Sequence, residues 1–370
     1  MSILVVGAGP TGLTAALELA RRGREVEVID RKANGSTLSR AVGILPASLR
    51  CLAPSGVTPK LLAEGVALEE VRFFLGRRPA LQLSLRSADT THGYILALPQ
   101  DRTEALLRDA LLACGGSVRY DVELQSLRQE DELVIANTTQ DGERSFEYVI
   151  GADGIGSTTR EQCGLAFPGY DLPEPWSIAD VDARNWPHAD AFSVCRSKVG
   201  KVSVVAPIDR DRYRVVSNTD DALECLPLEL DVQTIRRAGT FRISIRQVEE
   251  YRHGRIFLAG DAAHCHSPVG GRGMNLGIAD GADLAQRLVE GGLDGYSAAR
   301  RTEGKRTIAG SERMRKFMTS KNPIVRALVP LGMGALACAP ALRRRLSRNM
   351  LQGSFRGDTE APPQDHSSLR

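Results

Sequence analysis

The feature that most constrains this chain lies in its first thirty residues. Ile3–Val6 is a short run of apolar, mostly β-branched residues, which is typical of a buried strand. The turn Gly7-Ala8-Gly9-Pro10-Thr11-Gly12 follows it directly, and a second apolar strand, Val26–Ile29, ends in Asp30. Between the turn and that strand, apolar residues recur at helical spacing, at Leu13, Ala16, Leu17 and Ala20. The stretch therefore predicts a strand, a glycine turn, a helix, a second strand and an acid.

This order of elements is that of a dinucleotide-binding unit. Its glycines permit a tight turn and let backbone N–H groups approach a pyrophosphate, while the helix N-terminus favours the phosphate charge. Asp30 is placed to accept a hydrogen bond from a ribose hydroxyl. A glycine turn can also serve structure alone, but the strand, the helix and the acid together favour a ligand. The first candidate cofactor-binding residues are Gly7, Gly9, Pro10, Thr11, Gly12, Asp30 and Arg31.

Composition bounds the class of protein. A length of 370 residues suffices for about two domains. The 48 basic and 45 acidic residues leave a net charge of +3, which gives no electrostatic case for a nucleic-acid partner. The seven cysteines are scattered and contain no CxxC pair, so we expect a reducing compartment. No apolar run is long enough to span a membrane, and the N-terminus begins with a buried strand, so we expect a cytoplasmic protein without a signal peptide.

The chain leaves its first unit and returns to it twice. Buried strands at Glu147–Ile150 and Ile256–Ala259 resemble the first strand, and each runs into a glycine-rich turn. Between them, several prolines and four strand-like runs predict an inserted antiparallel sheet. We expect a discontinuous nucleotide-binding domain at 1–70, 95–165 and 255–320, and a substrate-binding β domain at 71–94 and 166–254. C-terminal helices should follow at 321–352, with a disordered tail at 353–370.

Three glycine-acid turns each follow a buried strand, at 7–12, 151–160 and 260–275. Ligands of an open α/β sheet lie beyond the carboxyl ends of its strands, so we expect these turns to converge on one extended ligand. In the third turn, Asp261 can accept from polyol hydroxyls, and bare glycine backbone can lie against a flat ring. A helix that begins near Asn275 would direct its positive end toward that ring and stabilise an anion there.

The same motifs resemble those of the class A flavoprotein monooxygenases, the family of para-hydroxybenzoate hydroxylase and the aromatic polyketide hydroxylases. Gly260-Asp261-Ala262-Ala263-His264, followed by Pro268 and by the run 270–275, resembles its second FAD motif. Gly151-Ala152-Asp153-Gly154 with Arg160 resembles its Asp-Gly motif, which is assigned to FAD and to the reduced nicotinamide. Arg40-Ala41 and Pro99-Gln100 resemble smaller FAD signatures, and Tyr296 with Arg300 and Arg301 resembles the start of its long C-terminal helix.

The resemblance implies a three-layer, glutathione-reductase-like FAD domain with an inserted antiparallel sheet and a helical C-terminus. It extends over roughly residues 1–320 and departs from the family at Asp30, often Glu, and at Arg272, often Gln. Arg272 would lie near the flavin or the entrance to the cavity. The cofactor-binding residues that the resemblance implies are Arg40, Gln100, Asp153, Arg160, Gly260, Asp261, Pro268, Gly271, Gly273, Met274 and Asn275.

His264, Cys265 and His266 are all metal-ligand types, but alternate positions in a tight turn point apart. We therefore expect no metal; His264 would be structural, and Cys265 and His266 would pack or line the cavity. His266 facing the substrate is the sharper alternative. The apolar stretch 330–342, followed by three arginines, could anchor at a membrane surface, although a helix packed on the first domain or in a dimer contact is favoured.

The sequence predicts an FAD-dependent monooxygenase that uses NADPH or NADH and O2 to hydroxylate an aromatic, phenolic or polyketide-like substrate. The resemblance implies that the oxygen is delivered through a flavin hydroperoxide. No nucleophile or catalytic residue stands out, and Pro268, His266 and Arg272 are the candidates near the flavin and substrate. The alternatives are a flavin oxidase or reductase and a catalytically silent FAD-binding protein. A halogenase is disfavoured because the tryptophans, Trp176 and Trp186, do not form its WxWxIP segment. We expect a monomer or a homodimer.

Overall fold

The computed structural model describes residues 1–35, 41–86, 92–197 and 200–352. Arg40 and the tail 353–370 lie outside the described residues. Within them, β1 (Ile3–Val6) is a central strand of a six-stranded sheet. Its order is β20 (Arg252–His253), β21 (Ile256–Leu258), β12 (Tyr148–Gly151), β1, β2 (Val26–Asp30) and β8 (Ser117–Tyr120). All neighbouring strands are parallel except β20 and β21, so the carboxyl ends of β1, β2, β12 and β21 share one edge.

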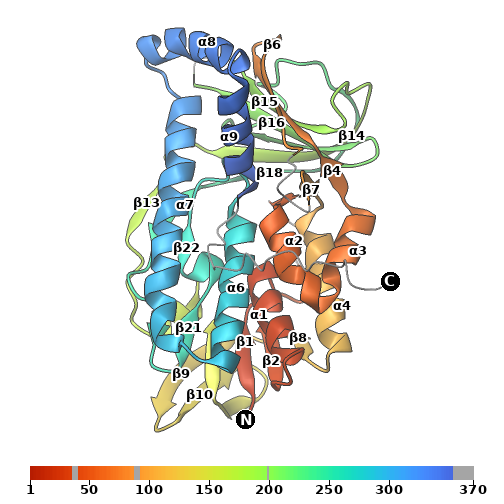
Figure 1. The fold of residues 1–370 in the computed structure, drawn as a ribbon. Helices are drawn as coiled ribbons and strands as arrows, with labels where there is room; N and C mark the ends of the chain where they lie inside the picture. Colours follow the sequence, from red (N-terminus) through yellow and green to blue (C-terminus); the bar gives the residue numbers. More distant parts are fainter. Residues whose placement is uncertain (36–40, 87–91, 198–199, 353–370) are drawn as a thin grey trace, which may run out of the picture.

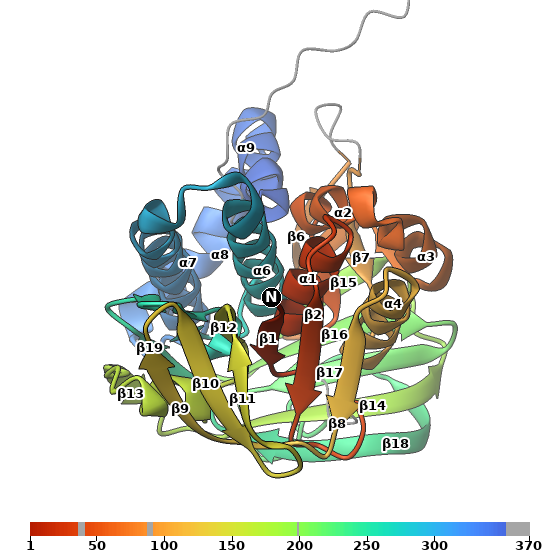
Figure 2. The same ribbon diagram turned by 90° about the horizontal axis from the view of Figure 1, so that it is seen from below.

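Layers on both faces of this sheet explain why β1 is apolar throughout (Figure 2). Ile3 and Val5 pack toward helices α1 (Pro10–Ala20), α4 (Gln100–Ala113) and α6 (Gly273–Glu290). Leu4 and Val6 pack toward an antiparallel sheet of β9 (Leu124–Glu130), β10 (Leu133–Thr138) and β11 (Gly142–Phe146). The alternating side chains of one strand therefore fill two cores, and the mixed α/β fold is confirmed.

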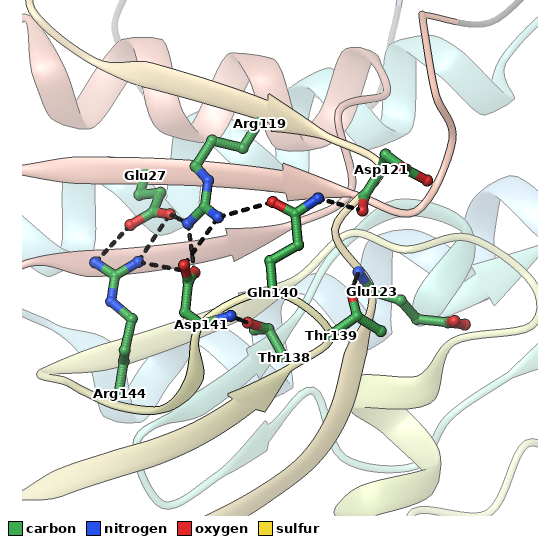
Figure 3. Close-up of polar contacts among 9 residues, drawn as sticks. All are labelled: Glu27, Arg119, Asp121, Glu123, Thr138, Thr139, Gln140, Asp141 and Arg144. Atoms are coloured by element: carbon green, nitrogen blue, oxygen red, sulfur yellow. Dashed lines mark hydrogen bonds and ion pairs between the residues drawn. The ribbon is translucent and has the colours of Figure 1, made fainter.

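Charged side chains fasten β11 and the neighbouring turn to the six-stranded sheet (Figure 3). Glu27 on β2 accepts from Arg119 on β8 at 2.9 Å and from Arg144 on β11 at 2.8 Å. Both arginines also pair with Asp141, in the turn before β11. We call these four residues the exposed network, because three of them lie substantially in solvent.

A second, seven-stranded sheet lies apart from the first and comes from two separate chain segments. Its order is β18 (Asp231–Phe241), β14 (Trp176–Arg184), β17 (Arg212–Ser217), β16 (Val202–Asp209), β15 (Ala191–Arg196), β5 (Glu70–Leu75) and β6 (Arg78–Ser84). The prediction of an antiparallel sheet is wrong at one pair, since β5 and β15 are parallel. No hairpin joins these two strands, which come from segments far apart in the sequence, so no tight turn forces them to be antiparallel.

Smaller elements connect the two sheets. Strand β4 (Val66–Leu68) directly precedes β5 in the chain but belongs to another sheet. It pairs with β7 (Ile95–Ala97), which also pairs with β3 (Gly43–Ile44). Another three-stranded sheet contains β13 (Gly169–Asp171), β19 (Ser244–Gln247) and β22 (His264–Cys265). The short helices are α2 (Pro46–Leu52), α3 (Val57–Glu64) and α5 (Thr158–Gln162).

Helices α7 (Tyr296–Met318), α8 (Pro323–Ala337) and α9 (Pro340–Leu351) complete the described chain (Figure 1). Val329 and Met333 of α8 pack on β6, so this apolar stretch covers the seven-stranded sheet rather than the first unit. Its outer side chains Ile324, Leu328 and Leu331 are exposed. Within the described ranges, no single helix is long and apolar enough to cross a membrane; α8 and α9 together reach that length and composition, but they are bent by 103°.

Candidate functional site

The first two glycine turns lie against each other at the carboxyl edge of the six-stranded sheet. Gly7 has a φ of +109°, and a Cβ on it would lie 2.3 Å from the carbonyl oxygen of Ala152. Ala152 in turn donates its N–H to the carbonyl of Val6 at 2.8 Å. Only glycine combines this backbone angle with so close an approach. The expected convergence of these turns is therefore present in the structure.

Arg160 joins the second turn to the third. Its guanidinium donates to the carbonyl of Ala262 at 3.0 Å and to that of Ile155 at 2.9 Å. The same group lies over the ring of Phe167, 4.1 Å from the centroid. Burial lowers the pKa of this arginine, and Asp153 opposes that shift. Because these contacts join the second turn to the third, Arg160 sets the spacing between the two turns.

Asp153 organises the start of α5. One carboxylate oxygen accepts from Ser157 Oγ at 2.5 Å, and the other accepts from the N–H and the hydroxyl of Thr159 at 2.9 and 3.0 Å. Burial raises the pKa of Asp153, and these donors oppose the rise. Resemblance alone assigned this residue to the cofactor; the structure gives both of its oxygens protein partners.

Asp30 lies at the end of β2, beside the first turn. Its oxygens accept from the N–H of Ala8 at 2.8 Å and from that of Lys32 at 2.9 Å. Each carboxylate oxygen can accept a second hydrogen bond, so these contacts leave capacity for a ribose hydroxyl. Arg31, the next residue, is exposed, and Arg40 lies outside the described residues.

A buried charged cluster, which we call the buried triad, supports the third turn. Asp280 of α6 is fully buried and accepts from His264 Nε2 at 2.5 Å, from Arg300 Nε at 2.6 Å and from the N–H of Gly260 at 2.9 Å. Burial acts to raise the pKa of Asp280, but Arg300 and His264 outweigh it and hold the pKa below its usual value. The triad therefore fixes both ends of the turn 260–264.

The sequence predicted a structural His264 but missed its partner Asp280. The available signal was weak: Asp280 is one of several polar residues of α6, and Arg300 lies on the next helix. Tyr296, one turn before Arg300, donates its hydroxyl to the carbonyl of Leu258 at 2.9 Å. The motif at the start of α7 thus holds the strand end from which the third turn emerges.

Asn275, in the first turn of α6, has all four hydrogen-bonding positions of its amide filled by protein. Oδ1 accepts from the N–H of Leu45 and from Ser48 Oγ, both at 2.8 Å. Nδ2 donates to the carbonyls of Gly43 and Gly271, both at 2.9 Å. Its side chain has no capacity left for another ligand. Asn275 therefore fastens the loop 270–275 to the segment 43–48.

His266 precedes that loop, and Arg272 lies within it. His266 Nδ1 donates to the carbonyl of Ser267 at 2.7 Å, because that oxygen can only accept, and this leaves Nε2 as a buried acceptor. Burial lowers the pKa of His266 to about 4, so the ring is neutral at pH 7. Arg272 directs its side chain to α9, where it donates to the carbonyl of Asn349 at 3.0 Å. Pro268 is exposed in the loop between them.

The remaining candidates have mixed surroundings. Gln100 opens α4 and donates to Glu104 at 2.7 Å, which leaves its amide carbonyl available on that side. Met274 is buried at the start of α6, whereas Asp261 is exposed at the carboxyl edge. Among the residues that the structure describes, there is no group of three or more His, Cys, Asp or Glu side chains that could hold a metal.

These residues fit an extended dinucleotide. Gly9 caps α1, and a Cβ on Gly9 would meet no atom within 4 Å. The first-turn N–H groups of α1 precede its intrahelical hydrogen bonds and point out of the helix end. The first turn of α6 presents a second such end beside Gly271, whose Cβ side is also open. Two positive helix ends and bare backbone thus share one edge of the sheet.

Comparison with known proteins agrees with this fit. A family described as an FAD binding domain matches residues 1–224 and 227–310. The chain is 31% identical over 385 aligned positions to 6-methylpretetramide 4-monooxygenase of Streptomyces rimosus, which covers 95% of this chain and 68% of that protein.

Solved structures share the fold over nearly the whole chain. The anhydrotetracycline hydroxylase OxyS from Streptomyces rimosus superposes with a TM-score of 0.78 at 29% identity, covering 97% of this chain and 78% of that one. The p-nitrophenol 4-monooxygenase PnpA from Pseudomonas putida DLL-E4 gives a TM-score of 0.86 over 95% of this chain and 98% of that one; at 23% identity it supports the fold alone. The family resemblance of the sequence is confirmed, and this chain belongs to the FAD-dependent class A flavoprotein monooxygenases.

Proposed function

We propose that this chain hydroxylates an aromatic small molecule, phenolic or polyketide-like, with O2 and with NADPH or NADH as reductant. The observation that carries the proposal is the position of the loop 270–275. Asn275 ties it to the segment 43–48, which borders an apolar cluster on the seven-stranded sheet. A flat cofactor ring on this loop would lie beside apolar side chains, the surroundings that an aromatic substrate requires. The polyketide substrate in the name of the Streptomyces rimosus relative is of the same chemical class.

Each part of the FAD would have its own group of residues. The first turn would hold the pyrophosphate, Asp30 and Arg31 the adenosine ribose, and Asp261 the polyol linker. Asp153, Arg160 and Asn275 would act mainly by setting the positions of the turns. The full set that we propose is Gly7, Gly9, Pro10, Thr11, Gly12, Asp30, Arg31, Arg40, Gln100, Asp153, Arg160, Gly260, Asp261, Pro268, Gly271, Gly273, Met274 and Asn275.

When bound, FAD would accept a hydride from the nicotinamide and activate O2 for insertion of one oxygen atom into the substrate. The residues of this chain place and protect the reacting groups. The N-terminus of α6 would stabilise negative charge on the ring, and the apolar cluster would exclude water. A neutral His266 would add no positive charge beside the loop and would leave its Nε2 as a buried acceptor there.

FAD binding and substrate binding would be divided between the two large sheets. We assign FAD binding to 1–70, 95–165 and 255–320, and substrate binding to 71–94 and 166–254, with helices at 321–352. The protein would act in the cytoplasm as a monomer or a homodimer.

The test begins with anaerobic mixing of the purified holoenzyme with NADPH while its visible spectrum is recorded. Bleaching of the oxidised flavin bands and their return in air are expected. A panel of phenols and polyketide aromatics is then supplied under oxygen-18, and the product is analysed by mass spectrometry. One oxygen-18 atom per product molecule supports the proposal. Substrate-dependent hydrogen peroxide without labelled product would favour an oxidase, and a flavin that NADPH never bleaches, even with substrates present, would favour a silent binder.

A further inference from the structure

Arg272 connects the loop 270–275 with the end of the described chain. Its Nη2 donates to the carbonyl of Asn349 at 3.0 Å. Asn349 lies in the last turn of α9, where carbonyls have no intrahelical donor and carry the negative end of the helix dipole. A guanidinium is well suited to such a carbonyl because it brings both a donor and a positive charge. Figure 1 shows α9 running from α8 toward the N-terminal end of α6, where Arg272 lies.

The two residues that follow Asn349 reach into the apolar cluster beside the loop. Leu351 is 2% exposed and packs with Leu45, whose N–H is held by Asn275. The cluster continues onto the seven-stranded sheet and the short strand β7. Its members are Leu45, Val71, Leu85, Ile95 and Leu351, with Phe73, Phe192, Val194 and Met350 packed at the margin.

The cluster is not sealed on all sides. Phe73, Phe192, Val194 and Met350 are only partly buried, unlike the other members. Two aromatic rings and the flexible methionine therefore leave part of their apolar surface accessible at the margin of the cluster. Apolar surface of this kind is what an aromatic ring system would contact.

We propose that the last turn of α9 roofs the substrate chamber, that Arg272 is the positioning residue that holds the roof to the loop 270–275, and that Met350 and Leu351 set the size of ring system admitted. The inference rests on the proposed function for the identity of the ligand class. It assigns a local role to the position at which this chain departs from the glutamine common in its family. It also explains why the Arg272 side chain is directed toward α9.

Hydrogen exchange of the FAD-loaded, full-length protein tests the attachment. In Arg272→Gln the amides of 340–351 should exchange at least about tenfold faster, the factor expected for loss of a charge-assisted hydrogen bond. Arg344→Gln is the matched control, because Arg344 is an exposed arginine of the same helix, and it should leave those rates within about twofold. Unchanged exchange in Arg272→Gln would overturn the positioning role.

Ligand binding tests the size selection. Planar phenols with one to four fused rings are bound to the holoenzyme in equilibrium dialysis, and the ratio of the Kd for four rings to that for one ring is measured. Leu351→Ala should lower this ratio about tenfold, since truncation makes room for the wider ligand. Met350→Ala is the second variant if Leu351→Ala folds poorly. Met350 is less buried, and its truncation should also lower the ratio. Leu342→Ala, exposed on α9, is the control and should not alter the ratio.

The two measurements separate this inference from the function on which it rests. If the proposed function is wrong, no phenol binds the wild-type protein, and the exchange rates alone decide whether Arg272 holds α9. If phenols bind but both truncations change all Kd values by one common factor, the roof does not select by size and that part of the inference fails. Accelerated exchange together with a lowered ratio would support both parts.

Discussion

The buried triad and the exposed network use the same chemistry in opposite surroundings. Each joins arginine to a carboxylate that accepts from several donors. In the triad, the side chains of Asp280, His264 and Arg300 are 0%, 1% and 8% exposed. In the exposed network, Glu27 is 12% exposed and Arg144 is 40% exposed (Figure 3). Solvent thus screens one set of charges and is nearly absent from the other.

The difference in solvent exposure determines whether such a cluster affects stability or the geometry of the site. Hydrogen bonding from Arg119 lowers the pKa of Asp141, but water around these groups reduces the free energy gained. Burial of the triad costs desolvation free energy, which the pairing of its charges must offset. The triad is therefore not expected to add much net stability. Its effect is positional: it holds Gly260 and His264, and with them the third turn. The exposed network joins two layers that apolar packing already holds together.

Among substitutions in the two clusters, Asp280→Asn should cause the largest loss of stability. The change leaves Arg300 buried without its counter-charge, which should lower the free energy of unfolding by about 3–5 kcal/mol. FAD affinity should also fall, because the third turn loses its support. Urea denaturation and fluorescence titration with FAD measure the two effects. Asp283→Asn, on the same helix but in a partly exposed pair with Arg287, should cost less than about 1 kcal/mol. Equal losses in the two variants would show that burial does not distinguish these regions.

The pH dependence of stability should next test burial beside the triad, at His266, two residues after His264. Burial lowers the pKa of His266 to about 4, whereas an unfolded histidine titrates near 6.5. Between these values the unfolded chain binds a proton at this histidine that the folded chain does not bind. His266 therefore makes its full contribution to stability above pH 6.5, and the free energy of unfolding decreases by about 3 kcal/mol as the pH falls toward 4. Urea denaturation at several pH values should show this slope in the wild type and lose it in His266→Asn.

His253→Asn provides the control for that slope, because His253 is exposed on β20. It should leave the dependence on pH unchanged. A slope that survives in His266→Asn would assign it to another group and contradict the burial of a neutral His266.

Gly277→Ala should have the next largest effect, through the helix that carries Asp280. A Cβ at this position would lie 2.1 Å from Thr11 Oγ1, so α6 and α1 could no longer approach as closely. Overpacking of this kind should cost about 1–3 kcal/mol, measured by thermal denaturation. In Gly310→Ala of α7, the new Cβ meets no atom within 4 Å, and stability should rise by about 0.5–1 kcal/mol. If both variants gained stability, the contact between α1 and α6 would not be tight.

The sequence predicted those parts of the fold that local patterns determine. The strand, turn and helix at the N-terminus follow from adjacent residues, and so do the three turns at the ends of buried strands. The parallel pairing of β5 with β15 was missed because it joins segments about a hundred residues apart without a turn between them. Strand β18 was missed because it is an exposed edge strand with little apolar alternation.

The site shows the same limit. Motifs identified Asn275 and Asp153, yet they could not reveal that protein groups occupy these side chains. Asp280 was missed because its partners, His264 and Arg300, lie 16 and 20 residues away on other elements. The sequence shows Asp280 as one of several polar residues in its helix; only the packing of three elements shows what neutralises it.

Substitutions in the exposed network should change the free energy of unfolding least. Arg144→Gln removes one of the two arginines that pair with Glu27, and the free energy of unfolding should fall by only about 0.2–1 kcal/mol in urea denaturation. Because solvent reaches these charges, 1 M NaCl should abolish most of that difference. The loss in Asp280→Asn should persist in the same salt, since ions do not enter the surroundings of the triad. A salt-resistant loss of several kcal/mol in Arg144→Gln would mean that β11 depends on its charges rather than on apolar packing, and the contrast between the two regions would disappear.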